Sequence, residues 1–245
     1  TIAVSTDTFA LLLTAIVAGI GFLIVLYSGG YFTDVTKRSR FLAQMSLFTA
    51  GMVGVVASDE LLGLFVFWEI TTVASYLLIG FDDEKAEARA SALQAVLVTT
   101  SGGLAMLAGF VLLAMASDTT RISTIVADPP TGTMVSVALV LIFLGAFTKS
   151  AQFPFHFWLP GAMAAPTPAS AFLHSATMVK AGIVLLLLLA PGFASTALWM
   201  GVVTATGLVT MALGAVTAIR QRDLKLLLAY GTVSQLGFMT ALIGL

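Results

Sequence analysis

Apolar runs of roughly 20 residues recur from one end of this sequence to the other, separated by short charged or Gly/Pro-rich breaks. An α-helix rises about 1.5 Å per residue, so each run is long enough to cross about 30 Å of hydrocarbon. Only 9% of the residues are charged, whereas soluble domains carry about 25%. The chain has too little polar surface for a soluble fold. The sequence therefore predicts an all-α integral membrane protein.

The breaks divide the chain into eight candidate spans, so we expect about eight transmembrane helices. The approximate limits of these spans are 9–29, 41–57, 61–81, 92–116, 134–153, 167–190, 198–219 and 224–245. The chain has no cysteine and two histidines, which leaves few soft ligands, and we expect neither a metal nor a cofactor. The formal charge of −1 and the scattered basic residues predict no nucleic-acid binding.

Basic residues are distributed unevenly between alternate connections. Arg121 is the one basic residue in the second, fourth and sixth connections. The first, third, fifth and seventh connections together hold Lys37, Arg38, Arg40, Lys85, Arg89, Arg220, Arg222 and Lys225. Lys and Arg are enriched in cytoplasmic loops. We therefore predict a multi-pass protein of a prokaryotic cell membrane, with both ends of this segment on the extracytoplasmic side.

The fifth span is expected to contain a broken helix near residues 149–165. Four of the seven prolines lie close together in this part of the chain: Pro154, Pro160, Pro166 and Pro168. Each proline removes a backbone donor and obstructs the preceding turn, and Pro154 and Pro160 are the expected break points. Broken helices at membrane depth occur where they are buried in protein or line a water-filled cavity. A plain loop is the alternative, although aromatic residues at 153–158 make the segment unusually apolar for a loop.

Three Asp, Glu, Lys or Arg residues lie well inside the predicted spans, away from the span ends: Glu69, Lys149 and Lys180. Glu69 is about 12 Å along its span. A charge at the bilayer centre costs roughly 2.5 to 3.5 kcal/mol on insertion scales, so such residues usually mark ion pathways. A buried lysine suits proton relay, and an acid that can approach or leave it would act as a switch. Two structural roles stay open: a static Glu–Lys pair, and a lysine that snorkels to the interface, which would suit Lys225.

Polar neighbours of these charges could extend a proton path. Glu69, Thr72 and Tyr76 occur at i, i+3 and i+7, on one face of a helix. His174, which can carry a proton near neutral pH, precedes Lys180 in the sixth span, predicted as one continuous helix. Further candidate supporting residues lie in the break and at the start of the last span: Gln152, His156 and Lys225. Simple hydrogen bonding between helices is the alternative role for these polar residues.

Three segments resemble the large antiporter-like subunits shared by Mrp-type multisubunit Na+/H+ antiporters and respiratory complex I. They are FVFWEITTVASYLLIGF around Glu69, TKSAQFPFHFWLPGAMAAPTPASAFLHSATMVKAG at 148–182, and RDLKLLLAYGTVSQLGFM at 222–239. Together with TTSGGLAMLAGFVLL at 99–113, they make the chain most similar to the Mrp A subunits. The resemblance covers nearly the whole chain, which is similar to the third to tenth helices of a longer member, so we expect a segment of a larger protein.

The resemblance implies an inverted-repeat bundle in which each five-helix repeat forms a half-channel around a broken helix. Residues 1–245 would be a single antiporter-like transmembrane domain. Residues 41–190 would form the first repeat, and residues 198–245 would begin the second. The second broken helix would then follow Leu245.

The resemblance also implies roles for four residues and a function. Glu69 matches the acid of the first half-channel, Lys149 the broken-helix lysine, Lys180 the bridging lysine and His174 a residue on the connecting path. The implied protein is a proton-translocating subunit of a monovalent cation (Na+)/H+ antiporter and not an enzyme, with other subunits, H+, Na+ and lipid as partners. One alternative is a proton-pumping subunit of a complex I-like NADH:quinone oxidoreductase or membrane hydrogenase. The second is a non-transporting membrane scaffold.

Overall fold

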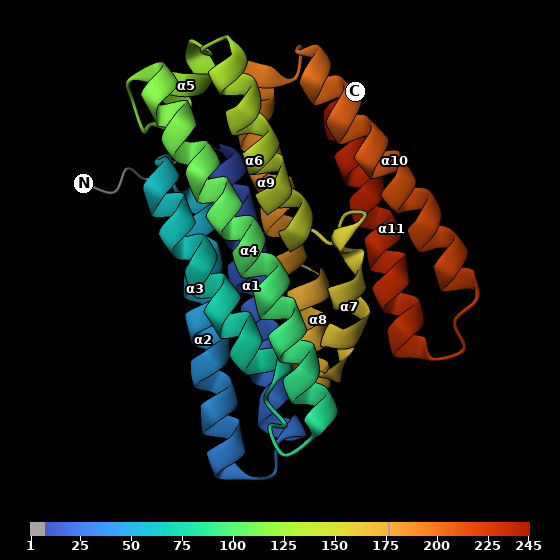
Figure 1. Ribbon diagram of the computed structural model, residues 1–245. Coiled ribbons are helices and arrows are strands. Elements are labelled where there is room, and N and C mark those ends of the chain that lie inside the picture. The colour runs from blue at the N-terminus through green and yellow to red at the C-terminus, as the bar shows by residue number, and fades with distance from the viewer. Residues whose placement is uncertain (1–7, 176) are drawn as a thin grey trace.

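The computed structural model describes residues 8–175 and 177–245, and the described residues form a bundle of α-helices joined by short connections. Most of the helices lie side by side along one axis, while α10 and α11 form a hairpin at one edge (Figure 1). Seven helical segments of the described chain are long and apolar enough to cross a membrane, with Thr167–Phe193 taken as one segment, and α6 is a shorter apolar helix. The predicted all-α membrane fold with about eight spans is confirmed.

The first four helices correspond to the first four predicted spans. They are α1 (Thr8–Tyr31), α2 (Val35–Ala57), α3 (Leu61–Ile79) and α4 (Ala86–Ser117). Helix α2 begins six residues before its predicted span because Asp34 caps it, accepting hydrogen bonds from the amides of Thr36 at 2.7 Å and Lys37 at 3.3 Å. Helices α2 and α4 therefore extend beyond their apolar cores into charged sequence. Apolar runs mark the part of a helix in hydrocarbon and not its full length.

A short helix that the hydropathy pattern did not predict, α5 (Ile122–Ala127), lies in the connection after α4. Asp59, in the α2–α3 connection, accepts hydrogen bonds from the Ser123 amide at 2.8 Å and the Ser123 hydroxyl at 2.7 Å. The amide of Ile122 also donates to the Asp59 carbonyl at 3.1 Å. These bonds tie two connections together at one end of the bundle.

Helices α10 (Ala197–Ile219) and α11 (Leu224–Gly244) pack backbone to backbone. A Cβ atom added at Gly214 would lie 2.6 Å from the Ser234 amide, and one added at Gly207 would overlap the Ala241 amide. Only glycine permits this approach, and small residues serve the same purpose in many membrane helix pairs.

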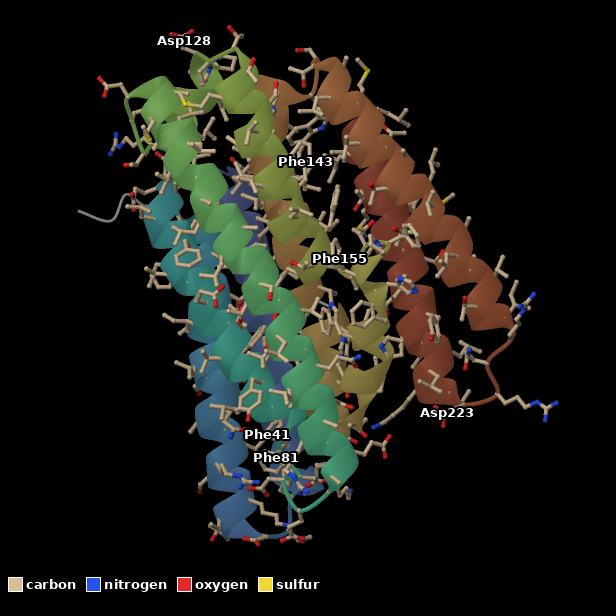
Figure 2. All side chains as sticks on the ribbon, in the orientation of Figure 1. Phe41, Phe81, Asp128, Phe143, Phe155 and Asp223 are labelled. Atoms are coloured by element: carbon tan, nitrogen blue, oxygen red, sulfur yellow. The ribbon has the colours of Figure 1, made fainter. Side chains whose placement is uncertain are left out.

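The predicted break after residue 149 is confirmed. Helix α6 (Thr133–Lys149) ends there, and it is followed by η1 (Phe155–Phe157), α7 (Trp158–Gly161) and η2 (Ala162–Ala164). Figure 2 labels Asp128 and Asp223 near opposite ends of the bundle and Phe155 about midway between them. The irregular backbone therefore lies at mid-depth, surrounded by helices.

The prediction that the sixth span is a single continuous helix is wrong. The structure shows α8 (Thr167–Ser175), η3 (Met178–Lys180) and α9 (Ala181–Phe193). Thr177 has φ −131° and ψ −85°, outside the helical region, and its hydroxyl donates to the Phe172 carbonyl at 2.7 Å. No proline or glycine marks this second interruption, so the apolar pattern could not reveal it.

The connections that carry most of the basic residues lie at the same end of the bundle. Figure 1 shows the α1–α2, α3–α4 and α10–α11 connections at one end, and α5 and the α9–α10 connection at the other. At the first end, the Arg40 guanidinium lies 4.4 Å from the centroid of the Phe81 ring and 3.7 Å from Asp83. This arrangement has the alternation expected of consecutive membrane crossings. Which end faces the cytoplasm stays a prediction.

Candidate functional site

Helix α3 supplies one wall of the candidate site. Glu60 caps its N-terminus by accepting hydrogen bonds from the amides of Leu62 at 3.4 Å and Gly63 at 2.7 Å. Further along the helix, Trp68 and Thr72 lie one turn apart and are both fully buried. Residues four apart share a helix face, so the Trp68 carbonyl and the Thr72 hydroxyl meet the same neighbouring element.

That neighbouring element is the end of α6, where Lys149 is fully buried. The Lys149 Nζ donates to Thr72 Oγ1 at 2.6 Å and to the Trp68 carbonyl oxygen at 3.3 Å. It also lies 5.2 Å from the centroid of the Trp68 ring. A buried ammonium needs acceptors or a counter-charge to offset its lost hydration. The direct acceptors here are neutral groups of α3.

Glu69 follows Trp68 on α3, yet it forms no direct ion pair with Lys149 among the described residues. The two charges nevertheless act on each other electrostatically. The Oε1 atom of Glu69 is buried and has no hydrogen-bond partner in the described part of the chain. The structure thus brings the predicted acid and lysine into one site but keeps them out of contact.

The predicted polar face of α3 is assembled only in part. Thr72 binds Lys149, whereas Tyr76 is 41% exposed and lies outside the buried cluster. Helices that pack against one another cross at an angle, so successive turns of one face are covered unequally. Thr72 and Tyr76 therefore lie on the same face of α3, but only Thr72 is buried.

The backbone at the end of α6 closes on itself. The Ser150 amide donates to the Ala146 carbonyl and the Gln152 amide to the Phe147 carbonyl, each at 2.9 Å. Ala151 takes a left-handed conformation with φ +47° between these two bonds. This is the geometry of a helix ending that satisfies the last carbonyls. The break therefore begins immediately after Lys149.

Side chains from other elements satisfy the remaining backbone groups of the break. The Trp158 indole donates to the Thr148 carbonyl at 2.9 Å. The Phe153 amide, just before Pro154, donates to Thr210 Oγ1 of α10 at 2.9 Å. Buried backbone groups require such partners. Thr210 thus connects the break to the α10–α11 hairpin.

Gln152 and His156, the two candidate supporting residues in the break, retain unused polar atoms. Gln152 is fully buried and its Nε2 donates to the Ser150 carbonyl at 3.0 Å, while its Oε1 is buried without a partner among the described residues. The His156 ring stacks on Phe153 with centroids 6.2 Å apart. No hydrogen bond joins Gln152 or His156 to Lys149 within the described ranges.

His174 and Lys225 both lie near the far end of the broken segment. The Lys225 Nζ, at the start of α11, donates to the carbonyls of Met163 at 3.2 Å and Ala165 at 3.4 Å. His174 is 5% exposed, lies beside the backbone of Ala162 and is within electrostatic range of Lys225. Lys225 therefore binds the end of the break in addition to lying near the end of the bundle.

The backbone next to Lys180 contacts the end of α6 next to Lys149, but the Lys180 side chain lies in a separate cavity. The Ser150 hydroxyl donates to the Val179 carbonyl at 2.6 Å, which fixes η3 against the end of α6. The Lys180 side chain lines a cavity of about 220 Å³ whose other walls are apolar side chains of α1, α2, α9 and α11. No hydrogen bond joins Lys180 to Lys149 or His174 among the described residues. The predicted line of ionisable groups is therefore interrupted in this conformation.

Four residues of the site were not predicted from the sequence as functional candidates: Trp68, Gly103, Ser150 and Thr210. Trp68 directly precedes Glu69, which was a usable signal. Gly103 of α4 lies against the Glu69 carboxylate, and its only signal in the sequence is the adjacent Gly102, a pattern typical of close helix packing. The hydrogen bonds of Ser150 and Thr210 join elements distant in sequence, so no local pattern could have revealed them.

The geometry allows a proton to be exchanged without breaking a contact ion pair. Lys149 is held by neutral acceptors, and a carboxylate nearby changes the free energy of its charged form through Coulomb interaction. Because the strength of that interaction depends on distance, motion of the Glu69 side chain alone would alter how tightly Lys149 holds its proton.

Comparisons with known proteins identify relatives over almost the whole chain. The chain is 47% identical over 243 residues to an Na(+)/H(+) antiporter subunit of Alkalihalophilus pseudofirmus, an alignment that covers 98% of this chain and 30% of the relative. The solved Mrp complex from Dietzia sp. DQ12-45-1b contains a chain with a TM-score of 0.94 and 43% identity, covering 98% of this chain and 27% of that one. The present chain thus spans less than a third of the length of these two relatives.

A second solved structure comes from a respiratory assembly. A chain of the membrane-bound sulfane sulfur reductase, described as an archaeal respiratory membrane complex, has a TM-score of 0.85 and 27% identity. That match covers 96% of this chain and 49% of the archaeal chain. Residues 58–245 also match the family Proton_antipo_M, described as NADH:quinone oxidoreductase/Mrp antiporter, TM. This chain therefore belongs to the NADH:quinone oxidoreductase/Mrp antiporter transmembrane family.

Proposed function

We propose that this chain forms the first half-channel of a proton-translocating subunit in a multisubunit monovalent cation/proton antiporter. Protons enter between α3 and α6 and charge Lys149 under the control of Glu69. They then pass by Lys180 and His174 toward the second repeat. The observation that carries this proposal is the fully buried Lys149 amino group at a helix break, bonded to neutral acceptors and acted on by the charge of Glu69.

The identities of the ion and partners are proposed from the relatives. The similar protein of Alkalihalophilus pseudofirmus is named as part of an Na(+)/H(+) antiporter, and we propose Na+ as the cation exchanged here. The similar Dietzia chain belongs to an Mrp complex, which supports other membrane subunits as partners. Moving one charge across 100 mV is worth about 2.3 kcal/mol, the energy scale on which the exchange operates.

The second step of the path requires side-chain motion. The Ser150–Val179 hydrogen bond places the end of α6 one residue from Lys180, but the Lys180 side chain lines an apolar cavity. Lysine has a flexible four-carbon stem. Rotation of that stem out of the cavity would bring the ammonium toward the break, so Lys180 acts as a movable carrier in this proposal.

Substitution of Lys149 in the full-length assembled complex tests the proposal. Lys149→Ala and Glu69→Gln should each lower Na+-driven proton exchange at least tenfold, because one removes the carrier and the other removes its controlling charge. Exchange is measured in inverted membrane vesicles with a pH-sensitive dye, and assembly is measured on native gels. Lys85→Ala is the matched control, since Lys85 lies in an exposed connection and pairs with Asp82 at 3.0 Å.

The outcomes separate transport from a structural role. Loss of exchange in both site variants, with normal assembly and an active Lys85→Ala complex, supports the proposal. Undiminished exchange in assembled Lys149→Ala and Glu69→Gln complexes would contradict it and favour the scaffold, in which buried charges only hold the helices together.

A second candidate function is favoured by the likeness to the archaeal respiratory chain, which is described as part of a respiratory membrane complex. In that case the same site would pump protons with energy from electron transfer. Vesicles containing the full assembly distinguish the two cases. Proton movement on addition of Na+ without an electron donor supports the antiporter, whereas movement that requires an electron donor supports the redox-driven pump.

A further inference from the structure

The carboxylate of Glu69 occupies a space that exists because residue 103 has no side chain. Gly103 is buried on α4. A Cβ atom added there would overlap Glu69 Oε1 and would lie 3.6 Å from the Nε1 atom of Trp68. Both Oε1 and Nε1 are buried without a hydrogen-bond partner among the described residues. We call this space the Gly103 niche: the surface of Gly103 with Glu69 Oε1 and Trp68 Nε1 beside it.

We propose that Gly103 is a positioning residue whose missing side chain holds open the niche that keeps the Glu69 carboxylate apart from the Lys149 ammonium. This inference rests on the proposed function of Glu69 and Lys149. Gly103 touches no transported ion in the proposal. It acts through the position of the carboxylate, which sets the strength of the Coulomb interaction with Lys149.

The two adjacent glycines of α4 serve different neighbours. A Cβ at Gly102 would overlap the Thr148 side chain of α6, whereas one at Gly103 would overlap the Glu69 carboxylate of α3. The pair thus lets α4 accommodate side chains from both helices that form the site. Because a carboxylate is the free end of a flexible side chain, a methyl group at residue 103 can displace it without moving the α3 backbone.

Gly109, six residues further along α4, offers a contrast. A Cβ at Gly109 would lie 2.7 Å from the carbonyl oxygen of Ala138, which belongs to the α6 backbone. Backbone cannot rotate away, so an alanine there should separate α4 from α6. Gly103→Ala is expected to redirect one side chain, and Gly109→Ala to disturb helix packing.

The charges around the niche determine where a displaced carboxylate would go. The charges of Glu69 and Lys149 act on each other. The other ionisable groups on α3 and on the elements packed against α3 and α6 are these: Lys37, Arg38 and Arg40 near the start of α2, Tyr76 of α3, Glu87 and Arg89 in the first turn of α4, His156 of η1, His174 of α8 and Lys180 of η3. A carboxylate expelled from the niche is therefore attracted toward Lys149. The resulting contact pair would hold the lysine in its charged form.

Gly103→Ala in the full-length complex should therefore lower exchange about tenfold and move the pH of half-maximal exchange to more alkaline values, since deprotonation of Lys149 would require a lower proton concentration. A purely structural defect would lower the amplitude without moving the pH profile. Leu104→Ala is the matched control, because Leu104 is the next residue of α4 and is 58% exposed. Gly109→Ala serves as the packing-defect comparison.

A shorter acid at residue 69 should rescue the defect of the Gly103→Ala variant. Glu69→Asp withdraws the carboxylate by about 1.5 Å, roughly one carbon–carbon bond, which makes room for the methyl group. The Gly103→Ala/Glu69→Asp double variant should exchange better than the product of the two single effects predicts, by about threefold or more. If Gly103→Ala instead reduces assembly, Glu69→Asp should restore the assembled amount, and it should not do so for Gly109→Ala.

The results distinguish this inference from the function on which it rests. An unchanged rate and pH profile in assembled Gly103→Ala complex would overturn the inference, as would a double variant showing neither improved exchange nor improved assembly. If Glu69→Gln is inactive while Gly103→Ala is normal, the niche has no role and the proposed function stands. If Glu69→Gln is fully active, the proposed function itself fails.

Discussion

At the scale of single residues, the site is defined by which polar groups are paired and which are not. Lys149 has two neutral acceptors on α3, whereas Glu69 Oε1 and Trp68 Nε1 have no partners among the described residues. An unpaired buried polar atom costs about 1 to 3 kcal/mol. Natural structures keep few such atoms, and each of them calls for an explanation, of which a catalytic role is one. The unpaired atoms beside Lys149 therefore support a functional site in which side chains change their hydrogen-bond partners.

The hydroxyl of Thr72 should be needed for normal exchange. Thr72→Val keeps the shape of the side chain but removes the acceptor 2.6 Å from the Lys149 Nζ. Hydrogen bonds to charged groups contribute about 1.5 to 3 kcal/mol, so we expect a fall in exchange of roughly tenfold or more. Dye-based exchange assays measure the rate, and Thr72→Ser, which retains the hydroxyl, should stay within about twofold of the parent protein. Equal rates for the valine and serine variants would show that this hydrogen bond is not used.

At the scale of elements, the two interrupted spans pack against each other. The break after α6 and the interruption between α8 and α9 are joined by the Ser150–Val179 hydrogen bond. The first break is joined to the α10–α11 hairpin by the Phe153–Thr210 bond and by Lys225. Irregular backbone at membrane depth is tolerated where protein supplies its partners. These contacts connect the proposed first half-channel to the helices that begin the proposed second repeat.

Removal of the Thr210 hydroxyl should loosen the hairpin from the break. Thr210→Val leaves the part-buried Phe153 amide without its acceptor at 2.9 Å, and loss of one hydrogen bond costs about 0.5 to 1.5 kcal/mol. We expect the purified complex to lose its assembled form at a lower temperature during graded heating. Thr210→Ser should behave like the parent protein. A valine variant with unaltered heat resistance would mean that another group satisfies the Phe153 amide.

At the scale of the whole molecule, the charged connections and the buried charges are separated in space. The connections that carry most of the basic residues lie at one end of the bundle, and the broken segment lies midway along it (Figures 1 and 2). Lys and Arg are retained on the cytoplasmic side of membranes. We therefore predict that the end with the α3–α4 connection faces the cytoplasm.

Cysteine labelling tests this orientation, because the chain has no cysteine of its own. Glu84→Cys and Asp128→Cys each introduce one thiol in an exposed connection, at opposite ends of the bundle. A membrane-impermeant maleimide should label residue 84 from outside in inverted vesicles and residue 128 in right-side-out vesicles. The reverse pattern would show that the basic connections face outward.

Much of the fold and part of the site could be predicted from the sequence. The eight spans follow from apolar length, and the first break follows from clustered prolines, because hydration and missing backbone donors act locally. Glu69 and Lys149 were predictable because charges in apolar spans are rare. The second interruption near Thr177 was not predictable because it lies inside an apolar run and no proline or glycine marks it. The short helix α5 was not predictable because six residues are too few to form a long apolar run.

The sequence by itself determined that these helices lie in a membrane and which ionisable residues are buried there. Only the tertiary structure decided the directions of those side chains. Lys149 reaches α3 while Lys180 lines an apolar cavity, and Glu69 lies against Gly103. Hydropathy depends on the composition of each segment, whereas contacts between side chains depend on how helices distant in sequence approach one another. Gly103 shows the difference, because its role comes from the carboxylate of another helix.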